Sequence, residues 1–151
     1  MNVRAADSAD AARLAQLRWE FRSAKIQPVE REEAFVARCA EWMRDALASG
    51  AWRAWIAEDG RAIVGQVWAH IIPKLPNPAL ERECHMYISN MFVTPAARGG
   101  VGTKLLDEAL ACARAERVDR VILWATDRSR TMYARAGFTP GERLMELDLS
   151  E

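Results

Sequence analysis

The residues that could do chemistry in this chain gather around a basic, glycine-rich turn. The turn follows an apolar stretch and begins an amphipathic helix; together they contribute Met91, Phe92, Val93, Arg98, Gly99, Gly100, Val101, Gly102, Thr103 and Lys104. A helix N-terminus leaves backbone N–H groups unpaired and carries the positive end of the helix dipole. Glycine lets a ligand approach that backbone closely. The pattern predicts a phosphate-binding turn, with a glycine-rich helix start that binds nothing as the alternative.

Two common nucleotide-binding loops do not fit this turn. A Walker loop places Lys directly after its last Gly, whereas Thr103 stands here between Gly102 and Lys104. A dinucleotide-binding fingerprint requires a third glycine at the position that Leu105 occupies. Neither loop is therefore expected.

Cys84 and His85 are neighbours, and this pair of residue types could support nucleophilic catalysis. Adjacent residues of a strand point to opposite faces, so the two side chains cannot easily share a proton. Cys39 and Cys112 fall on apolar helical faces, where a thiol usually packs as a small hydrophobe. Because the chain has no Cys-x-x-Cys pair, we expect three reduced cysteines and no metal site.

The elements that must position these residues follow from hydrophobic periodicity and turn residues. Strands are predicted over 2–5, 52–58, 61–72, 83–93, 120–125 and 138–149, with the fifth buried on both faces and the last antiparallel. Helices are predicted over about 8–22, 35–47, 101–117 and 126–136, the first capped by Asp7 with Asp10. Asp59-Gly60 predicts a type I′ hairpin turn. The order predicts a mixed α/β sheet covered by helices.

Length and charge limit the class of protein. The 151 residues suit one domain over 1–151, and 21 basic residues balance 21 acidic ones, so neither nucleic acid nor a membrane is an expected partner. No apolar run approaches the ~18 residues of a membrane span, and the start of the chain lacks a signal sequence. We expect a cytoplasmic protein.

Two separated motifs carry a resemblance to a known family. Residues 93–102 read Val-Thr-Pro-Ala-Ala-Arg-Gly-Gly-Val-Gly, and residues 132–138 read Met-Tyr-Ala-Arg-Ala-Gly-Phe. With the order of elements, they resemble the GNAT superfamily of acyl-CoA-dependent N-acetyltransferases over essentially the whole chain. The first is similar to that family's pyrophosphate loop, Gln/Arg-x-x-Gly-x-Gly/Ala, but Ala97 stands where the family has Gln or Arg. The second is similar to its Leu-Tyr-x-x-x-Gly-Phe segment.

The resemblance implies a fold and a set of roles. The sheet would be mostly antiparallel and splayed between its fourth and fifth strands, with helices on both faces. Acetyl-CoA would be the acyl donor, bound by residues 91–93 and 98–104, and a backbone N–H among residues 91–93 would stabilise the oxyanion. Tyr133 would protonate the departing thiolate. The general base would be His85 or Glu83, which lie on the strand before the turn.

The expected function is transfer of an acetyl group to a primary amine of a small molecule or a peptide N-terminus. A non-catalytic acyl-CoA-binding or sensor module with the same fold is one alternative. Another is an interaction protein with a tryptophan-rich face made of Trp19, Trp42, Trp52, Trp55 and Trp68. A homodimer is possible, as in similar families. Specificity is expected in segments 19–29 and 73–85, but neither contains a motif that identifies the amine.

Overall fold

A five-stranded sheet, in which the strands lie side by side in chain order, forms the centre of the computed structural model. The structure describes residues 1–150. The strands are β1 (Asn2–Ala5), β2 (Trp52–Asp59), β3 (Ala62–Pro73), β4 (Cys84–Val93) and β5 (Arg120–Ile122). Pairing is antiparallel from β1 to β4 and parallel between β4 and β5. The predicted mixed α/β class is thus confirmed.

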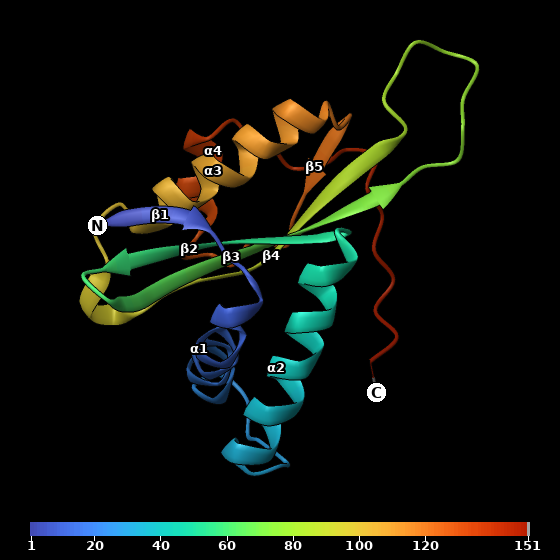
Figure 1. Cartoon of the computed structure of the whole chain (residues 1–151). Helices are drawn as coiled ribbons and strands as arrows, with labels where there is room; N and C mark the ends of the chain where they lie inside the picture. Colours follow the sequence, from blue (N-terminus) through green and yellow to red (C-terminus); the bar gives the residue numbers. More distant parts are fainter. Residues whose placement is uncertain (151) are drawn as a thin grey trace.

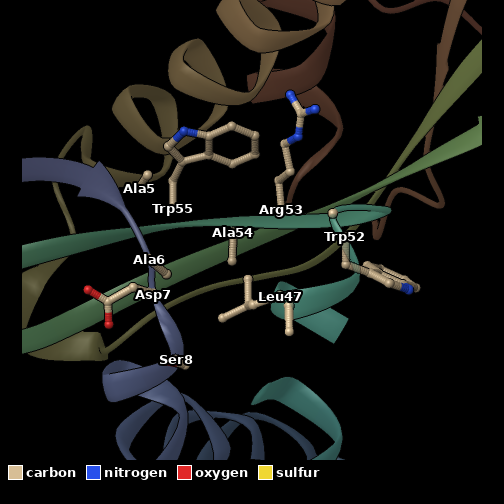
Figure 2. Close-up of a pocket in the computed structure, with 11 residues that line it drawn as sticks. Ala5, Ala6, Asp7, Ser8, Leu47, Trp52, Arg53, Ala54 and Trp55 are labelled. Atoms are coloured by element: carbon tan, nitrogen blue, oxygen red, sulfur yellow. The ribbon is translucent and has the colours of Figure 1, made fainter. Parts of the chain in front are cut away.

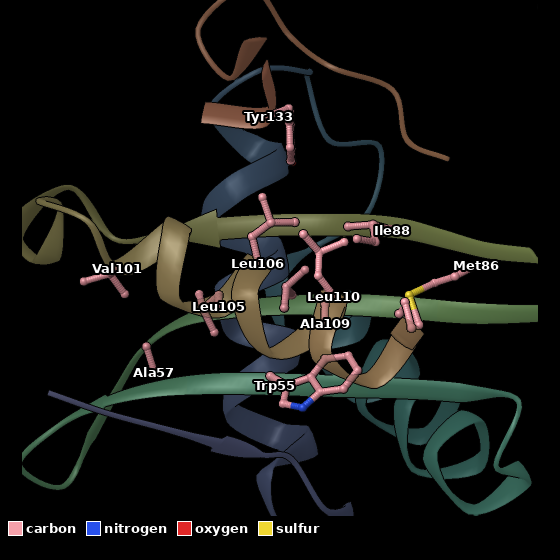
Figure 3. Close-up of a cluster of buried hydrophobic side chains, with 13 residues drawn as sticks. Trp55, Ala57, Met86, Ile88, Val101, Leu105, Leu106, Ala109, Leu110 and Tyr133 are labelled. Atoms are coloured by element: carbon pink, nitrogen blue, oxygen red, sulfur yellow. The ribbon is translucent and has the colours of Figure 1, made fainter. Parts of the chain in front are cut away.

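Helices cover both faces of this sheet (Figure 1). The short helix η1 (Ser8–Asp10), α1 (Ala11–Ser23) and α2 (Glu32–Ser49) lie on one face, where Leu14, Leu17 and Met43 pack against Ile56 and Trp68. The short helix η2 (Pro95–Ala97) follows β4, and α3 (Val101–Glu116) and α4 (Arg130–Arg135) lie on the other face. Figure 3 shows that second core, in which the side chains of α3 meet those of β2 and β4. The sheet is therefore the middle layer of three.

A β-bulge interrupts β4. Trp68 of β3 pairs with Ser89, but Gln66 pairs with Phe92, so Asn90 and Met91 together stand opposite a single residue. Asn90 adopts the left-handed conformation, with φ of +53°. The extra residue reverses the alternation of side chains along the strand. Ser89 and Asn90 consequently both face the α1–α2 layer.

The fourth and fifth strands share only a short stretch of pairing. His85, Met86 and Tyr87 pair with β5, which ends at Ile122, whereas β4 continues to Val93. Within residues 1–150, the bulged half of β4 therefore has no strand partner on this side, in agreement with the expected splay. The predicted fifth strand forms, but over Arg120–Ile122 rather than 120–125. The expectation that it is buried on both faces was wrong, because it lies at the sheet edge with Arg120 exposed and its other residues half-buried.

The last predicted strand, over 138–149, does not form. Residues 138–150 have no regular structure, and Leu144, Met145, Leu147 and Leu149 are 60–93% exposed. A strand needs a neighbouring edge, and the three residues of β5 provide too few ladder hydrogen bonds to hold a long partner. The segment contacts the body where the indole N–H of Trp124 donates to Glu146.

The hairpin between β2 and β3 forms as predicted, but its turn is shifted by one residue. Asp59 pairs with Ala62, so the two loop residues are Gly60 and Arg61. Gly60 has φ of +62°, and Arg61 is not among the residues with positive φ, a pattern typical of a type II′ rather than a type I′ turn. The shifted turn suits its residues, because a type II′ turn needs positive φ only at its first central position, which Gly60 occupies.

Candidate active site

The glycine-rich turn presents a run of free backbone donors. The N–H groups of residues 98–103 make no hydrogen bond with any other part of residues 1–150. Gly99 and Gly100 adopt φ of +117° and +89°, and a Cβ built on either would meet no atom within 4 Å. Because both glycines border open space, an anionic ligand can approach these amides. Arg98 and Lys104 beside them are exposed.

Gly102 lies where the start of α3 contacts α4. A Cβ at this position would lie 3.2 Å from the sulfur of Met132, the residue before Tyr133. A larger side chain would therefore require the Met132 side chain to shift. The glycine-rich turn thus contacts the residue next to the predicted acid.

Tyr133 lies on α4 with its side chain pointing toward Leu106 of the buried cluster (Figure 3), and only 6% of the residue is exposed. Its ring meets Phe138 edge-on at a centroid distance of 5.6 Å. The structure gives the hydroxyl no hydrogen-bond partner within residues 1–150. Burial raises the pKa of Tyr133 above its usual value, so the phenol stays protonated near neutral pH.

His85 and Glu83 lie at the end of β4 remote from the bulge. His85 pairs with Ile72 on one side and Arg120 on the other, and its buried Nδ1 has no hydrogen-bond partner in the described chain. The rise of a strand places His85 about 16 Å from Asn90 along β4. Glu83 precedes β4, and its carbonyl oxygen accepts a hydrogen bond from Lys74. The structure therefore does not bring these two residues next to the turn.

A pocket of about 360 Å³ lies between the bulge of β4 and the helices α1 and α2. We call it the α1–α2 pocket. Its lining comes from both helices and three strands and includes Arg18, Phe35, Arg38, Cys39, Trp42, Met43, Trp52, Trp68, Ser89 and Asn90. None of these is acidic. Arg18 was not predicted as a site residue from the sequence. The signal that could have identified it is a charged residue next to Leu17, on a helical stripe that is otherwise apolar.

Arg18 connects this pocket to the bulge. Its Nη1 donates a hydrogen bond of 3.2 Å to Oδ1 of Asn90. Burial, together with the nearby charge of Arg22, lowers the pKa of Arg18. Arg38, by contrast, is exposed and pairs with Glu30 outside the pocket. The pocket is thus apolar and electropositive.

The five tryptophans named above do not share one face. Trp42, Trp52 and Trp68 form a cluster, with ring centroids 5.4–6.3 Å apart. Trp55 belongs to the core on the other side of the sheet. The predicted tryptophan-rich interaction face is therefore not formed as a single surface.

A second hollow, of about 400 Å³, opens between β1, β2 and the end of α2 (Figure 2). Figure 2 shows Arg53 and Trp55 pointing to one side of β2 and Trp52 to the other. None of the predicted site residues lines this hollow. Its place at the far edge of the sheet separates it from the bulge.

Within residues 1–150, no helix is both long and apolar enough to cross a membrane. The same part of the chain contains no cluster of three or more side chains suited to hold a metal ion.

Solved structures with the same fold were found along the whole chain. A predicted acetyltransferase from Clostridium acetobutylicum, solved with acetyl-CoA, is 25% identical with a TM-score of 0.81, over 98% of this chain and 96% of that one. A GCN5-related N-acetyltransferase from Ralstonia eutropha JMP134 is 24% identical with a TM-score of 0.75, over 99% of both chains. An aminoglycoside acetyltransferase from an uncultured soil metagenomic sample is 20% identical with a TM-score of 0.72, over 99% of this chain and 98% of that one.

No curated protein matches this chain. The family model for the acetyltransferase (GNAT) family, however, matches residues 12–138. That range contains the bulged strand, the glycine-rich turn and Tyr133, and the fold around them is the one expected. The chain belongs to the GNAT family of acetyltransferases.

Proposed function

We propose that this protein transfers the acetyl group of acetyl-CoA to a primary amine of a small molecule or a peptide N-terminus. The observation that carries the proposal is the run of free N–H groups over residues 98–103, which faces open space beside the unpartnered half of β4. A diphosphate needs several such donors at once. Hydrogen bonds to a charged group contribute about 1.5–3 kcal/mol each, more than the helix dipole supplies.

The turn and the strand edge divide the binding of the coenzyme between them. The amides of residues 98–103 would hold the pyrophosphate, with Arg98, Thr103 and Lys104 adding polar or charged groups at the rim. The pantetheine arm would pair with the free edge of β4 as an added strand. Such a division would bring the thioester of acetyl-CoA beside the bulge.

The oxyanion would be stabilised by a backbone N–H near the end of β4. Thr94 donates its N–H to Val64 of β3, so strand alternation turns the N–H of Val93 toward the open edge. Met91, Phe92 and Val93 remain the proposed donor segment. A preset donor of this kind is worth about 3–4 kcal/mol.

The reaction then needs two proton transfers. The amine nitrogen attacks the carbonyl carbon, the tetrahedral intermediate expels the thiolate, and the Tyr133 hydroxyl donates a proton to that sulfur. The amine proton passes to a base, for which His85 is proposed with Glu83 as the alternative. Because His85 lies remote from the bulge, the proton would reach it through water along the face of β4 that carries Ser89 and Asn90. The products are the N-acetyl amine and free coenzyme A.

The alternative function is a non-catalytic acyl-CoA-binding or sensor module. The distance between the bulge and both base candidates favours it, as does Ala97 in place of the family's Gln or Arg. Such a module would bind acetyl-CoA without consuming it. The aminoglycoside acetyltransferase is related in fold, but its substrate class does not transfer to this chain at that identity.

One pair of measurements tests the proposal. Calorimetry with acetyl-CoA should show one site, and release of free thiol over a library of primary amines should identify at least one acceptor. Binding without thiol release would favour the sensor module. Absence of acetyl-CoA binding would refute both the transferase and the sensor module.

A further inference from the structure

The α1–α2 pocket contains a guanidinium group whose environment is incomplete. Arg18 is half-buried, yet its one side-chain hydrogen bond in residues 1–150 goes to the neutral amide of Asn90. No carboxylate there lies within salt-bridge distance of it. An arginine presents five N–H donors in a planar fork that suits a carboxylate. Buried charges are usually paired, so the missing partner points to an anionic ligand.

The aromatic side chains that line the pocket with Arg18 indicate the second chemical group of the ligand. The rings of Trp42, Trp52 and Trp68 stand tilted or edge-on to one another, and Phe35 completes the lining. Trp42 is 50% exposed, although large aromatic side chains gain most from burial. A flat apolar group placed against it would bury this surface.

The pocket, with its arginine and its aromatic walls, lies next to the bulge where the proposed acetyl transfer would occur. Arg18 contacts Asn90, and Asn90 is the first of the two bulge residues and directly precedes the proposed oxyanion donor segment, Met91 to Val93. A ligand that occupies the pocket therefore ends at the bulge, where the thioester would be delivered. Its reactive group must lie at that end.

We infer that the acceptor is an aromatic primary amine that also carries a carboxylate, with the carboxylate on Arg18, the ring against Trp42 and the amine at the bulge. This inference rests on the proposed function and specifies its substrate class. A polycationic amine does not fit, because no acidic side chain lines the pocket and Arg18 has no carboxylate partner within residues 1–150.

L-tryptophan and tryptamine form a matched pair of probes, since they share the ring and the amine and differ in the carboxylate. We expect thiol release with a kcat/KM that favours L-tryptophan in the wild-type protein. Arg18→Gln should reduce this preference by about 10- to 100-fold, the loss of one or two charged hydrogen bonds. Arg18→Lys should retain part of it, because the charge stays while the planar fork is lost.

Arg22→Gln is the matched control, because it removes the same charge one turn along α1 without lining the pocket. It should leave the preference for L-tryptophan unchanged. Equal use of both probes by the wild-type protein, or an equal loss in Arg22→Gln, would overturn the inference. So would faster thiol release with spermidine than with L-tryptophan.

Binding of indole-3-propionate separates this inference from the proposed function, because that molecule has the carboxylate and the ring but no amine. Calorimetry without acetyl-CoA should show binding to the wild-type protein and its loss in Arg18→Gln. If this holds while no amine releases thiol, the pocket assignment stands and the transferase function fails. If thiol is released with other amines while indole-3-propionate does not bind, the function stands and the pocket assignment fails.

Discussion

The guanidinium of Arg18 on α1 donates a hydrogen bond of 3.2 Å to the side chain of Asn90, the left-handed residue of the β4 bulge. This contact joins the helical layer to the one irregularity of the strand that leads to the glycine-rich turn. It lies where the α1–α2 pocket meets the open edge of β4. The proposed acceptor and donor sites therefore meet at these two residues.

The bulge conformation is testable at Asn90. Both Asn90→Gly and Asn90→Ala remove the acceptor for Arg18, but only alanine is penalised by a φ of +53°. We expect the alanine variant to be less stable than the glycine variant by about 1 kcal/mol in urea unfolding. Equal free energies of unfolding would show that the strand can relax out of the bulge.

Tyr133→Phe tests the proposed general acid. Turnover should fall by about 100-fold, the contribution of a positioned acid, while the affinity for acetyl-CoA stays the same. The free energy of unfolding should change little, because the hydroxyl has no hydrogen-bond partner in residues 1–150. Steady-state kinetics with calorimetry and urea unfolding measure all three. Unchanged turnover would remove Tyr133 from the mechanism.

The pH profile of the wild-type protein carries a related prediction. Burial raises the pKa of Tyr133, so the hydroxyl keeps its proton until the pH exceeds the usual value of about 10. Turnover should therefore show no alkaline decline caused by this residue below about pH 10. A decline near pH 8 that disappears in Tyr133→Phe would contradict this environment.

Gly100→Ala and Gly60→Ala compare two glycines with the same backbone demand. Both have positive φ and open space around the missing Cβ, so each alanine should cost about 1–2 kcal/mol of stability. Only Gly100→Ala should weaken acetyl-CoA binding in calorimetry, because Gly60 lies in the β2–β3 hairpin. Equal affinities in the two variants would argue against the turn as the diphosphate site.

The base can be tested by substitution of the two candidates. His85→Gln should lower kcat for thiol release by about 100-fold if the imidazole accepts the amine proton, whereas Glu83→Gln should leave kcat unchanged. The reverse result would assign the role to Glu83. An unchanged kcat in both variants would eliminate both residues.

Arg4 and Asp10 give a prediction about stability and pH. Arg4 donates two hydrogen bonds of 2.9 Å to the Asp10 carboxylate, and these hold the pKa of that carboxyl below its usual value. A lowered folded-state pKa means that the pair stabilises the fold above about pH 4, and that this stability is lost as the pH falls through the folded-state pKa.

Arg4→Gln should therefore cost about 1–2 kcal/mol at pH 7, less than a fully buried pair because Arg4 is partly exposed to solvent. The difference from the wild-type protein should shrink below about pH 4 in urea unfolding. Arg13→Gln is the control, since its pair with Glu20 is exposed and should contribute less than about 1 kcal/mol. Because Arg4 also binds the carboxylate of Glu58, a difference independent of pH would mean that neither Asp10 nor Glu58 is the group involved.

Local signals in the sequence were sufficient for the elements that need few distant contacts. Glycine content and helical periodicity placed the turn and α3, and the Asp7–Asp10 capping box formed as predicted. The two motifs around Gly102 and Tyr133 identified the family correctly. These features depend on residues close in the chain, where backbone conformation and side-chain periodicity act directly.

Pairing between distant segments decided what the sequence could not. The alternating residues of 138–149 favour a strand, but the three-residue β5 gives them no adequate edge. The one-residue shift of the hairpin turn is likewise seen only in the pairing of β2 with β3.

The sequence by itself determined the family, the phosphate-binding turn as a prediction and the two-sided sheet. Only the tertiary structure placed Ser89 and Asn90 on one face, because a bulge is visible only when β4 is paired with β3. Only packing of α1 against that face brought Arg18 to Asn90 and left the guanidinium beside Trp42 and Trp68. Side chains far apart in sequence share a pocket through register and helix packing, which local patterns do not encode.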